Sequence, residues 1–150
     1  IKEMIKANKH IKGSKVAIFG VTFKENTPDV RNTKVVDVIK ELEEYGIEVL
    51  VIDPVADEED LLNYYGIELK SKEEISDVDA IVFAVPHIEF IDVNLEKLKK
   101  LYRNDKFDFT QEVAATLAEN SRDNNFVLID IKGMFDRKKA ENIGYIYWRL

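Results

Sequence analysis

The stretch KVAIFGVTFKENTPDVRNTKVVDVIKEL, residues 15–42, decides the expected fold. Its first seven residues form an apolar run that is typical of a buried β-strand. Its second half has the i, i+3, i+4, i+7 spacing of an amphipathic helix, with apolar residues at Val35, Val38, Ile39 and Leu42. We expect this helix to begin at Asn32 or Thr33, either of which can cap it, and to end at Gly46. A strand, a polar loop and a helix therefore open the fold.

Strand-length apolar runs and helical patterns alternate along the rest of the chain. The expected strands span residues 15–21, 47–53, 67–70, 79–85, 126–131 and 145–148. The expected helices span residues 58–65 and 136–142, a segment with Leu95, Leu98 and Leu101, and one turn with capping-box spacing from Ser71 to Glu74. Val113, Ala114 and Leu117 indicate an extra surface helix within residues 103–125. Strands separated by helices require right-handed parallel crossovers, so we predict a three-layer, Rossmann-like α/β fold: an open, mainly parallel sheet with helices on both faces.

The length and composition predict one globular domain. With 150 residues, of which 45% are apolar, the chain can bury a full core. We assign residues 11–150 to that domain and interpret residues 1–10 as the tail of a helix from a preceding domain, with a frayed terminus as the alternative. Ile1 is not an initiator Met and no signal-like segment follows it, so we interpret the chain as a fragment of a longer protein.

Several classes of function are disfavoured by composition. The net charge is −7, with 29 acidic residues against 22 basic ones, which argues against a general nucleic-acid surface. No apolar run reaches the roughly 18 residues that a membrane span needs, so we expect a soluble protein. The absence of cysteine fits a reducing compartment, and we expect a cytoplasmic location. Cysteine is absent, which removes thiol nucleophiles and thiolate metal sites. His10 and His87 lie far apart in sequence, and a histidine metal site is not expected.

The expected ligand crevice lies at the carboxyl ends of the parallel strands. The loop after Gly20 reads VTFKENTPDVRNT and lacks G-x-G-x-x-G, so this domain is not expected to bind NAD in the standard way. The loop does place Lys24 and Arg31 before the amino end of a helix, where backbone N–H groups favour anions. Lys132 follows a later strand at the same edge of the sheet. We therefore predict that these three cations converge on an anion, such as a phosphate.

Each of these residues also has a plainer interpretation. Lys24 can be a solvated surface charge, and Asp29 and Arg31 can pair with each other merely to fix the loop. His87 can be a loop or capping residue. Asp53 resembles the acid that holds a ribose in dinucleotide folds, but it can simply end a strand. Phe23 suits either a core or a flat surface for a base. The residues alone therefore indicate an α/β domain that binds an anion.

The amino-acid sequences of several segments resemble those of a known family. Residues 15–42 resemble the start of the C-terminal UDP-binding domain of the UDP-glucose/GDP-mannose dehydrogenase family, in which a strand leads into a Gly-x-x-Phe-Lys-x-x-Thr-x-Asp-x-Arg loop. The segments IDPVAD, AIVFAVPHIEF and VLIDIKGMF follow in the expected order, and YWRL ends the chain. The resemblance covers residues 11–150 and is weakest over residues 103–125.

The resemblance implies a chemistry and roles for individual residues. Such enzymes oxidise a sugar C6 alcohol to a carboxylate with two NAD, and use an N-terminal NAD domain, a central helical dimer domain and a cysteine outside the C-terminal domain. The isolated chain is then expected to be inactive and the full-length enzyme a homodimer. Phe23 and Lys24 match a pair that contacts the nucleotide sugar, Arg31 matches an arginine that reaches NAD, and Lys132 matches a basic residue near the substrate.

The sequence resembles the branches of this family that act on UDP-N-acetylglucosamine or UDP-N-acetylmannosamine more than it resembles the UDP-glucose branch. The products of such enzymes are used in polysaccharide biosynthesis. Two alternatives belong to other classes. A response-regulator receiver also has a Lys after its last core strand, as Lys132 is here, but it needs an acidic pair after its first strand, where this chain has Gly20, Val21 and Thr22. A purely structural lid or assembly domain would bind no nucleotide.

Overall fold

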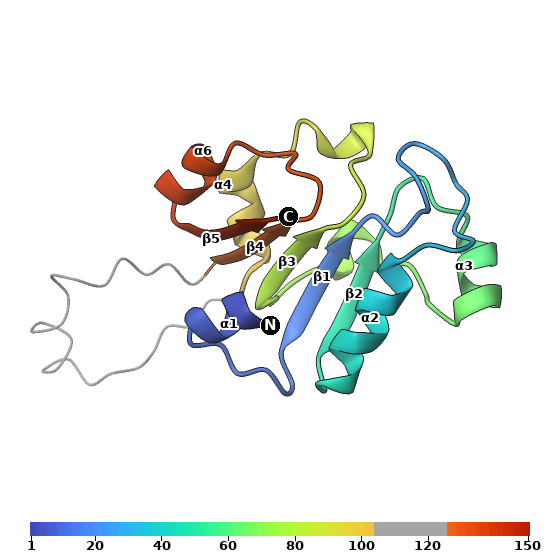
Figure 1. Ribbon diagram of the computed structural model, residues 1–150, viewed down its shortest axis with the longest axis horizontal. Coiled ribbons are helices and arrows are strands. Elements are labelled where there is room, and N and C mark those ends of the chain that lie inside the picture. The colour runs from blue at the N-terminus through green and yellow to red at the C-terminus, as the bar shows by residue number, and fades with distance from the viewer. Residues whose placement is uncertain (104–125) are drawn as a thin grey trace, which may run out of the picture.

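The computed structural model describes residues 1–103 and 126–150, and its centre is a five-stranded parallel sheet (Figure 1). The strands lie in the order β2-β1-β3-β4-β5. They are β1 (Lys15–Phe19), β2 (Glu48–Ile52), β3 (Ala80–Phe83), β4 (Phe126–Asp130) and β5 (Tyr145–Arg149). The chain leaves β1 to one side for β2 and returns to the other side for β3, and such a reversal creates a crevice at the carboxyl ends of the strands. The predicted Rossmann-like fold class is confirmed.

Two apolar cores cover the two faces of the sheet. Successive strand side chains point to opposite faces, so Val16 and Ile18 enter one core while Ala17 and Phe19 enter the other. The first core is closed by α2 (Val35–Glu44), by α3 (Glu58–Tyr65) near β2, and by α1 (Lys2–Lys6). The second is closed by the short helices η2 (Ile88–Phe90), α4 (Leu95–Leu98), η3 (Lys99–Leu101) and α6 (Arg137–Asn142).

The start of α2 differs from the expectation. The helix begins at Val35 after Lys34, whose side chain makes no capping hydrogen bond. Asn32 cannot cap it because its φ of +59° is left-handed, whereas a capping residue needs extended backbone. The Thr33 hydroxyl still accepts a 3.3 Å bond from the Val35 N–H. The end is as predicted, since the helix finishes at Glu44 and Gly46 follows with a φ of +74°.

Other expected elements are present in shorter form. Residues 67–70 contribute an isolated bridge between Leu69 and Val51 instead of a strand. The capping box of Ser71 and Glu74 opens a single 3-10 turn, η1 (Lys72–Glu74). The leucine segment gives one α-helical turn followed by a 3-10 turn. The surface helix expected around residues 113–117 lies outside the described residues.

The N-terminal residues pack onto the domain. Met4, within α1, and Ala7, in the turn that ends this helix, are buried in the first core. Lys9 lies 4.0 Å from the carboxylate of Asp79, which also accepts a bond from the Lys15 N–H and pairs with Arg103. The segment is therefore anchored at the amino end of β3. In residues 1–103 and 126–150, no helix is long and apolar enough to cross a membrane.

Candidate functional site at the carboxyl ends of the strands

Gly20 brings the first loop into close contact with β3. Its φ is +90°, and a Cβ atom added there would lie 2.7 Å from the Cβ of Val85 and 2.8 Å from the Val85 backbone nitrogen and oxygen. A side chain does not fit into this space, and the left-handed backbone also favours glycine. The glycine thus lets the loop of residues 21–34 leave β1 directly beside the segment that follows β3.

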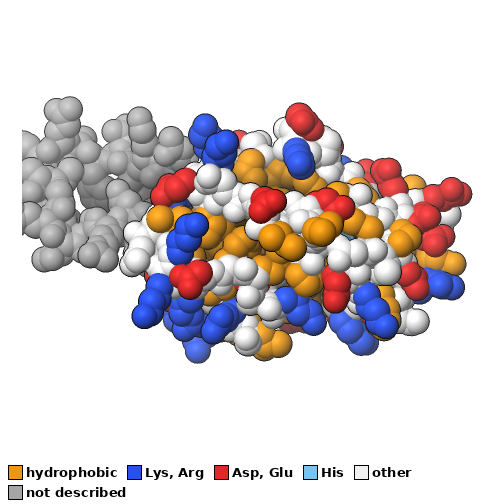
Figure 2. All heavy atoms as spheres, turned by 90° about the horizontal axis from the view of Figure 1, so that it is seen from above, with side chains coloured by type: hydrophobic (Ala, Val, Ile, Leu, Met, Phe, Trp, Pro, Cys, Tyr) orange, Lys and Arg blue, Asp and Glu red, His pale blue; other side chains and the backbone are white. Residues whose placement is uncertain are grey.

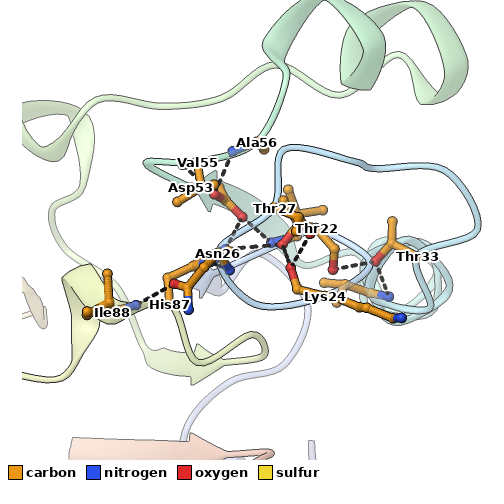
Figure 3. A network of polar contacts seen from close by, with 12 residues as sticks. Thr22, Lys24, Asn26, Thr27, Thr33, Asp53, Val55, Ala56, His87 and Ile88 are labelled. Atoms are coloured by element: carbon orange, nitrogen blue, oxygen red, sulfur yellow. Dashed lines mark hydrogen bonds and ion pairs between the residues drawn. The ribbon is translucent and has the colours of Figure 1, made fainter.

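A buried carboxylate organises the start of this loop (Figure 3). Asp53 follows β2, and its Oδ2 accepts a 2.7 Å bond from the Val21 N–H. Its Oδ1 accepts bonds from the N–H groups of Val55 and Ala56 at 2.8 and 2.9 Å. Both oxygens of the carboxylate therefore accept hydrogen bonds from backbone N–H groups, as expected for a residue that ends a strand. Asp53 does not present a free acid to a ribose.

His87 joins the same network from the loop after β3. Its side chain is fully buried, with Nε2 3.0 Å from Asp53 Oδ2 and 3.2 Å from the Thr22 hydroxyl. Its Nδ1 accepts a 2.9 Å bond from the Asn26 N–H. Because Nδ1 is an acceptor, the ring proton lies on Nε2, which donates to Asp53. His87 is therefore a loop residue, as the plainer interpretation proposed, and it links Asp53 to the loop after β1.

A pocket of about 300 Å³ opens beside this network. Its apolar lining comes from the sheet, from α2 and from the loops that follow β3 and β4: Ile18, Val35, Val38, Val82, Ala84, Val85, Pro86 and Ile131. The rest of its lining is Thr22, Phe23, Lys24, Glu25, Thr33, Lys34 and Lys132. Three lysines and one glutamate give the pocket a local positive charge in a protein of net charge −7. Such a charge suits an anionic ligand with an apolar part.

Two of the three cations that were expected to converge, Lys24 and Lys132, line this one pocket, and Phe23 lines it as well. Phe23 is half-exposed, and Lys24 Nζ lies 5.5 Å from its ring centroid in a cation–π contact. Sequence reasoning missed Lys34, which immediately precedes the first turn of α2 and whose Nζ also lies 3.3 Å from Asp37 Oδ2. Unpaired N–H groups and the helix dipole favour anions at that end of a helix.

Arg31 does not join the other cations. It lies outside the pocket lining and pairs with Asp29, through Nε at 2.9 Å and Nη2 at 3.2 Å. Hydrogen bonds to Arg31 lower the pKa of the Asp29 carboxyl, and the same pair raises the pKa of the guanidinium. The predicted convergence of three cations is therefore wrong for Arg31, because a carboxylate two residues away is the nearer partner.

The loop that carries Lys132 is also held by a buried carboxylate. Asp130 ends β4, and its Oδ2 accepts a 2.6 Å bond from the Tyr147 hydroxyl and a 2.9 Å bond from the Phe135 N–H. The two loops that supply Lys24 and Lys132 are thus fixed at their bases, which holds the two lysines beside one pocket. Within the described part of the chain, no group of three or more His, Asp or Glu side chains could hold a metal ion.

The surface at the carboxyl ends of the strands has an apolar centre that is surrounded by charged side chains (Figure 2). Figure 2 looks down on the carboxyl ends of the strands and shows apolar side chains across the middle of that face, with charged side chains around them. Phe23, Ile88 and Ile91 are among the exposed large apolar residues of the molecule. Phe23 lies in the loop after β1, and Ile88 and Ile91 lie at the start and just after the end of η2, in the segment that follows β3. An apolar centre with a charged border is typical of a surface that meets a ligand or another domain.

A family model described as the UDP-glucose/GDP-mannose dehydrogenase family, UDP binding domain, matches residues 17–111. The chain belongs to this family. The matched residues include the loop after β1 and the loop that carries His87. These two loops form the hydrogen-bond network of Asp53 and His87 and much of the pocket lining. The resemblance found in the sequence is therefore confirmed, and the fold described above is that of a domain of this family.

Individual relatives agree with the family assignment. The chain is 45% identical over 101 residues to UDP-N-acetyl-D-glucosamine 6-dehydrogenase of Pseudomonas aeruginosa, an alignment that covers 67% of this chain and 24% of the relative. It is 37% identical over 125 residues to protein CapL of Staphylococcus aureus, covering 75% and 30%. The chain therefore spans less than a third of the length of these relatives.

A solved structure has the same fold. It is the NDP-N-acetyl-D-galactosaminuronic acid dehydrogenase of Methanosarcina mazei Go1, with a TM-score of 0.74 and 24% identity. The likeness covers 99% of this chain and 26% of that one. The whole described domain therefore corresponds to one part of a larger dehydrogenase.

Proposed function

We propose that this chain binds the nucleotide part of a UDP-sugar in the pocket of Phe23, Lys24 and Lys132, as part of an NAD-dependent UDP-N-acetylhexosamine 6-dehydrogenase. The observation that carries the proposal is the gathering of these residues around one pocket in a UDP-binding domain of this family. The names of the relatives support a UDP-N-acetylglucosamine or UDP-N-acetylmannosamine substrate over UDP-glucose. The product would enter the synthesis of a polysaccharide.

The pocket residues suit the parts of a nucleotide sugar. Lys24 and Lys132 donate charge-assisted hydrogen bonds to diphosphate oxygens, and the exposed Phe23 ring offers a flat apolar surface to the base or sugar. The UDP group is remote from the C6 carbon that reacts. Its binding energy would orient that carbon in the full-length enzyme, which benefits the chemical step.

NAD belongs to another part of the protein in this proposal. The loop after Gly20 has no glycine fingerprint, and Asp53 is occupied by backbone N–H groups, so the residues of this chain do not fit a complete dinucleotide site. Arg31 would reach NAD from its exposed loop with the guanidinium donors that Asp29 leaves free. The remaining domains, the homodimer and a cytoplasmic location are further parts of the same proposal.

A binding experiment tests the nucleotide role. We expect the chain to bind UDP in an NMR titration at fixed salt, with weaker responses to GDP and NAD. Lys24→Ala should weaken UDP binding roughly ten-fold or more, since a hydrogen bond to a charged group is worth about 1.5–3 kcal/mol. Lys12→Ala, an exposed lysine before β1 at the opposite end of the sheet, is the matched control. Equal affinities of the Lys24 and Lys12 variants would contradict the assignment.

The same titration separates the remaining alternatives. A stronger response to UDP-glucose than to the two UDP-N-acetylhexosamines would favour the UDP-glucose branch. No response to any uridine nucleotide would favour a purely structural domain. A receiver is already disfavoured, because the Asp53 carboxylate accepts three backbone N–H bonds and is not open to a phosphoryl donor.

A further inference from the structure

We propose that His87 is a positioning residue for the nucleotide pocket: its Nδ1 atom holds the loop of residues 22–27 in the conformation that presents Phe23 and Lys24. His87 is fully buried and is not part of the pocket lining, so it would act on the ligand only through the loop. The inference rests on the proposed function, because the pocket must bind the nucleotide for its affinity to report on His87.

His87 contacts the loop on both sides of Lys24. Its Nδ1 accepts the Asn26 N–H at 2.9 Å, and its Nε2 lies 3.2 Å from the Thr22 hydroxyl. Asn26 returns a second bond to the β3 loop, because its side-chain oxygen accepts the Ile88 N–H at 2.8 Å. Asn26 also has a left-handed φ of +58°, a conformation that Asn tolerates better than most residues. Two hydrogen bonds thus join this turn to a segment more than 60 residues away.

The backbone of Lys24 lies between these contacts. Its carbonyl accepts the Thr22 hydroxyl at 2.8 Å and the Thr27 hydroxyl at 3.1 Å. In Figure 3 these residues form one continuous network with Asn26 and His87, and Lys24 lies on the side that faces Thr33. A side chain that extends from a fixed backbone loses less conformational freedom when it binds a ligand, so a held loop raises affinity without adding a contact.

Asp53 sets the direction of the ring. Its Oδ2 accepts a hydrogen bond from the Val21 N–H and lies 3.0 Å from Nε2, so it accepts a hydrogen bond from Nε2–H and leaves Nδ1 as the acceptor for Asn26. The order of contacts runs from Asp53 through His87 to the Asn26 N–H. If His87 only filled space in the core, it would not matter which ring nitrogen carried the proton. A positioning role requires the proton on Nε2, because only then can Nδ1 accept the Asn26 N–H.

Two amide substitutions at position 87 separate these roles. In His87→Asn, the side-chain oxygen is as many bonds from Cα as Nδ1, so it can still accept the Asn26 N–H. In His87→Gln, the side-chain nitrogen takes the place of Nε2 and can still donate to Asp53, while the acceptor for Asn26 is lost. Both variants lose the ring contact with Phe90, whose centroid lies 5.6 Å away. They therefore share the loss of this ring contact and differ in the hydrogen bond that they keep. Asn is also one methylene shorter than Gln, so lost packing alone would weaken His87→Asn more than His87→Gln, which is the opposite of the order expected here.

The measurements are the dissociation constant of UDP, the urea midpoint and the hydrogen exchange of the Asn26 amide in each variant. We expect similar midpoints, an affinity within about three-fold of the unaltered chain for His87→Asn, and a roughly ten-fold loss for His87→Gln, the size of one lost hydrogen bond. The Asn26 amide should exchange faster in His87→Gln than in His87→Asn. A ¹⁵N spectrum of the unaltered chain should show a proton on Nε2 and none on Nδ1.

The opposite results would overturn the proposal. Equal affinities of the two variants, or affinities that simply follow the midpoints, would reduce His87 to a core residue. A proton on Nδ1 in the unaltered chain would overturn it without any variant. If the unaltered chain fails to bind UDP, the proposed function fails, and the exchange of the Asn26 amide still decides whether His87 holds the loop.

Discussion

Gly20 combines a left-handed backbone with a lack of space beside it. Its φ is +90°, and the nearest atoms to an added Cβ belong to Val85, two of them in the backbone, at 2.7–2.8 Å. The Val85 backbone cannot easily move aside, because the N–H groups of Ala84 and Val85 donate to the Phe19 carbonyl at the end of β1. We therefore predict that Gly20→Ala lowers the free energy of unfolding by more than about 2 kcal/mol, since a left-handed conformation alone costs a non-glycine residue about 1–2 kcal/mol. Urea denaturation measures this loss.

Gly13 provides the control for Gly20. It also has a left-handed φ, +80°, but an added Cβ would meet nothing within 4 Å. Gly13→Ala should therefore carry the conformational cost without the clash, and its loss of stability should be clearly smaller. Equal losses for the two variants would show that backbone conformation, and not contact with Val85, makes Gly20 necessary.

Single residues also show what local sequence could and could not predict at the site. Lys24 and Lys132 were found because parallel strands bring their carboxyl ends to one edge of the sheet, whereas Phe23 was assigned only through the family resemblance. Arg31 was misplaced because Asp29 is close enough to pair with it first. The role of His87 depends on contacts with Thr22 and Asn26, 65 and 61 residues away. No local pattern carries that information.

At the scale of elements, α3 begins with a side-chain cap. Asp57 has extended backbone, and its carboxylate accepts the Asp60 N–H at 2.9 Å. We predict that Asp57→Ala lowers the free energy of unfolding by about 1 kcal/mol, the usual value of such a cap. Asp57→Asn keeps an acceptor and should cost less, as measured by urea denaturation. If the Ala and Asn variants lose the same stability, the charge near the helix dipole and not the hydrogen bond is the main contribution.

The elements that were predicted well are those that local chemistry determines. The core strands are continuous apolar runs, as expected for parallel strands buried on both faces, and Gly46 and Gly66 end the helices α2 and α3 at their expected places. The first residue of α2 could not be predicted from the neighbouring sequence. The Asn32 N–H donates to the Tyr65 hydroxyl, so a residue in α3 helps to set the turn before α2.

At the scale of the whole molecule, three tyrosines sit in the second core. Tyr102, Tyr145 and Tyr147 are at most 7% exposed. Their hydroxyls donate to the Val127 carbonyl, the Leu95 carbonyl and the Asp130 carboxylate, respectively. Burial raises the pKa of each phenol above its ordinary value of 10.0, and the Asp130 carboxylate raises that of Tyr147 further. The second core therefore requires the neutral form of all three side chains.

This requirement predicts a loss of stability in alkali. A group whose pKa is raised in the folded state stabilises that state fully below its unfolded pKa and loses this contribution as the pH rises towards the folded value. The free energy of unfolding should therefore fall as the pH rises above about 10, because the unfolded chain releases phenolic protons that the folded chain keeps. Urea denaturation at several pH values measures the slope. Tyr145→Phe removes one of the three phenols and should make the slope shallower, even if it lowers stability at neutral pH through the lost bond to Leu95. A stability that stays level to about pH 11 would mean that the three hydroxyls ionise in the folded core as readily as in the unfolded chain.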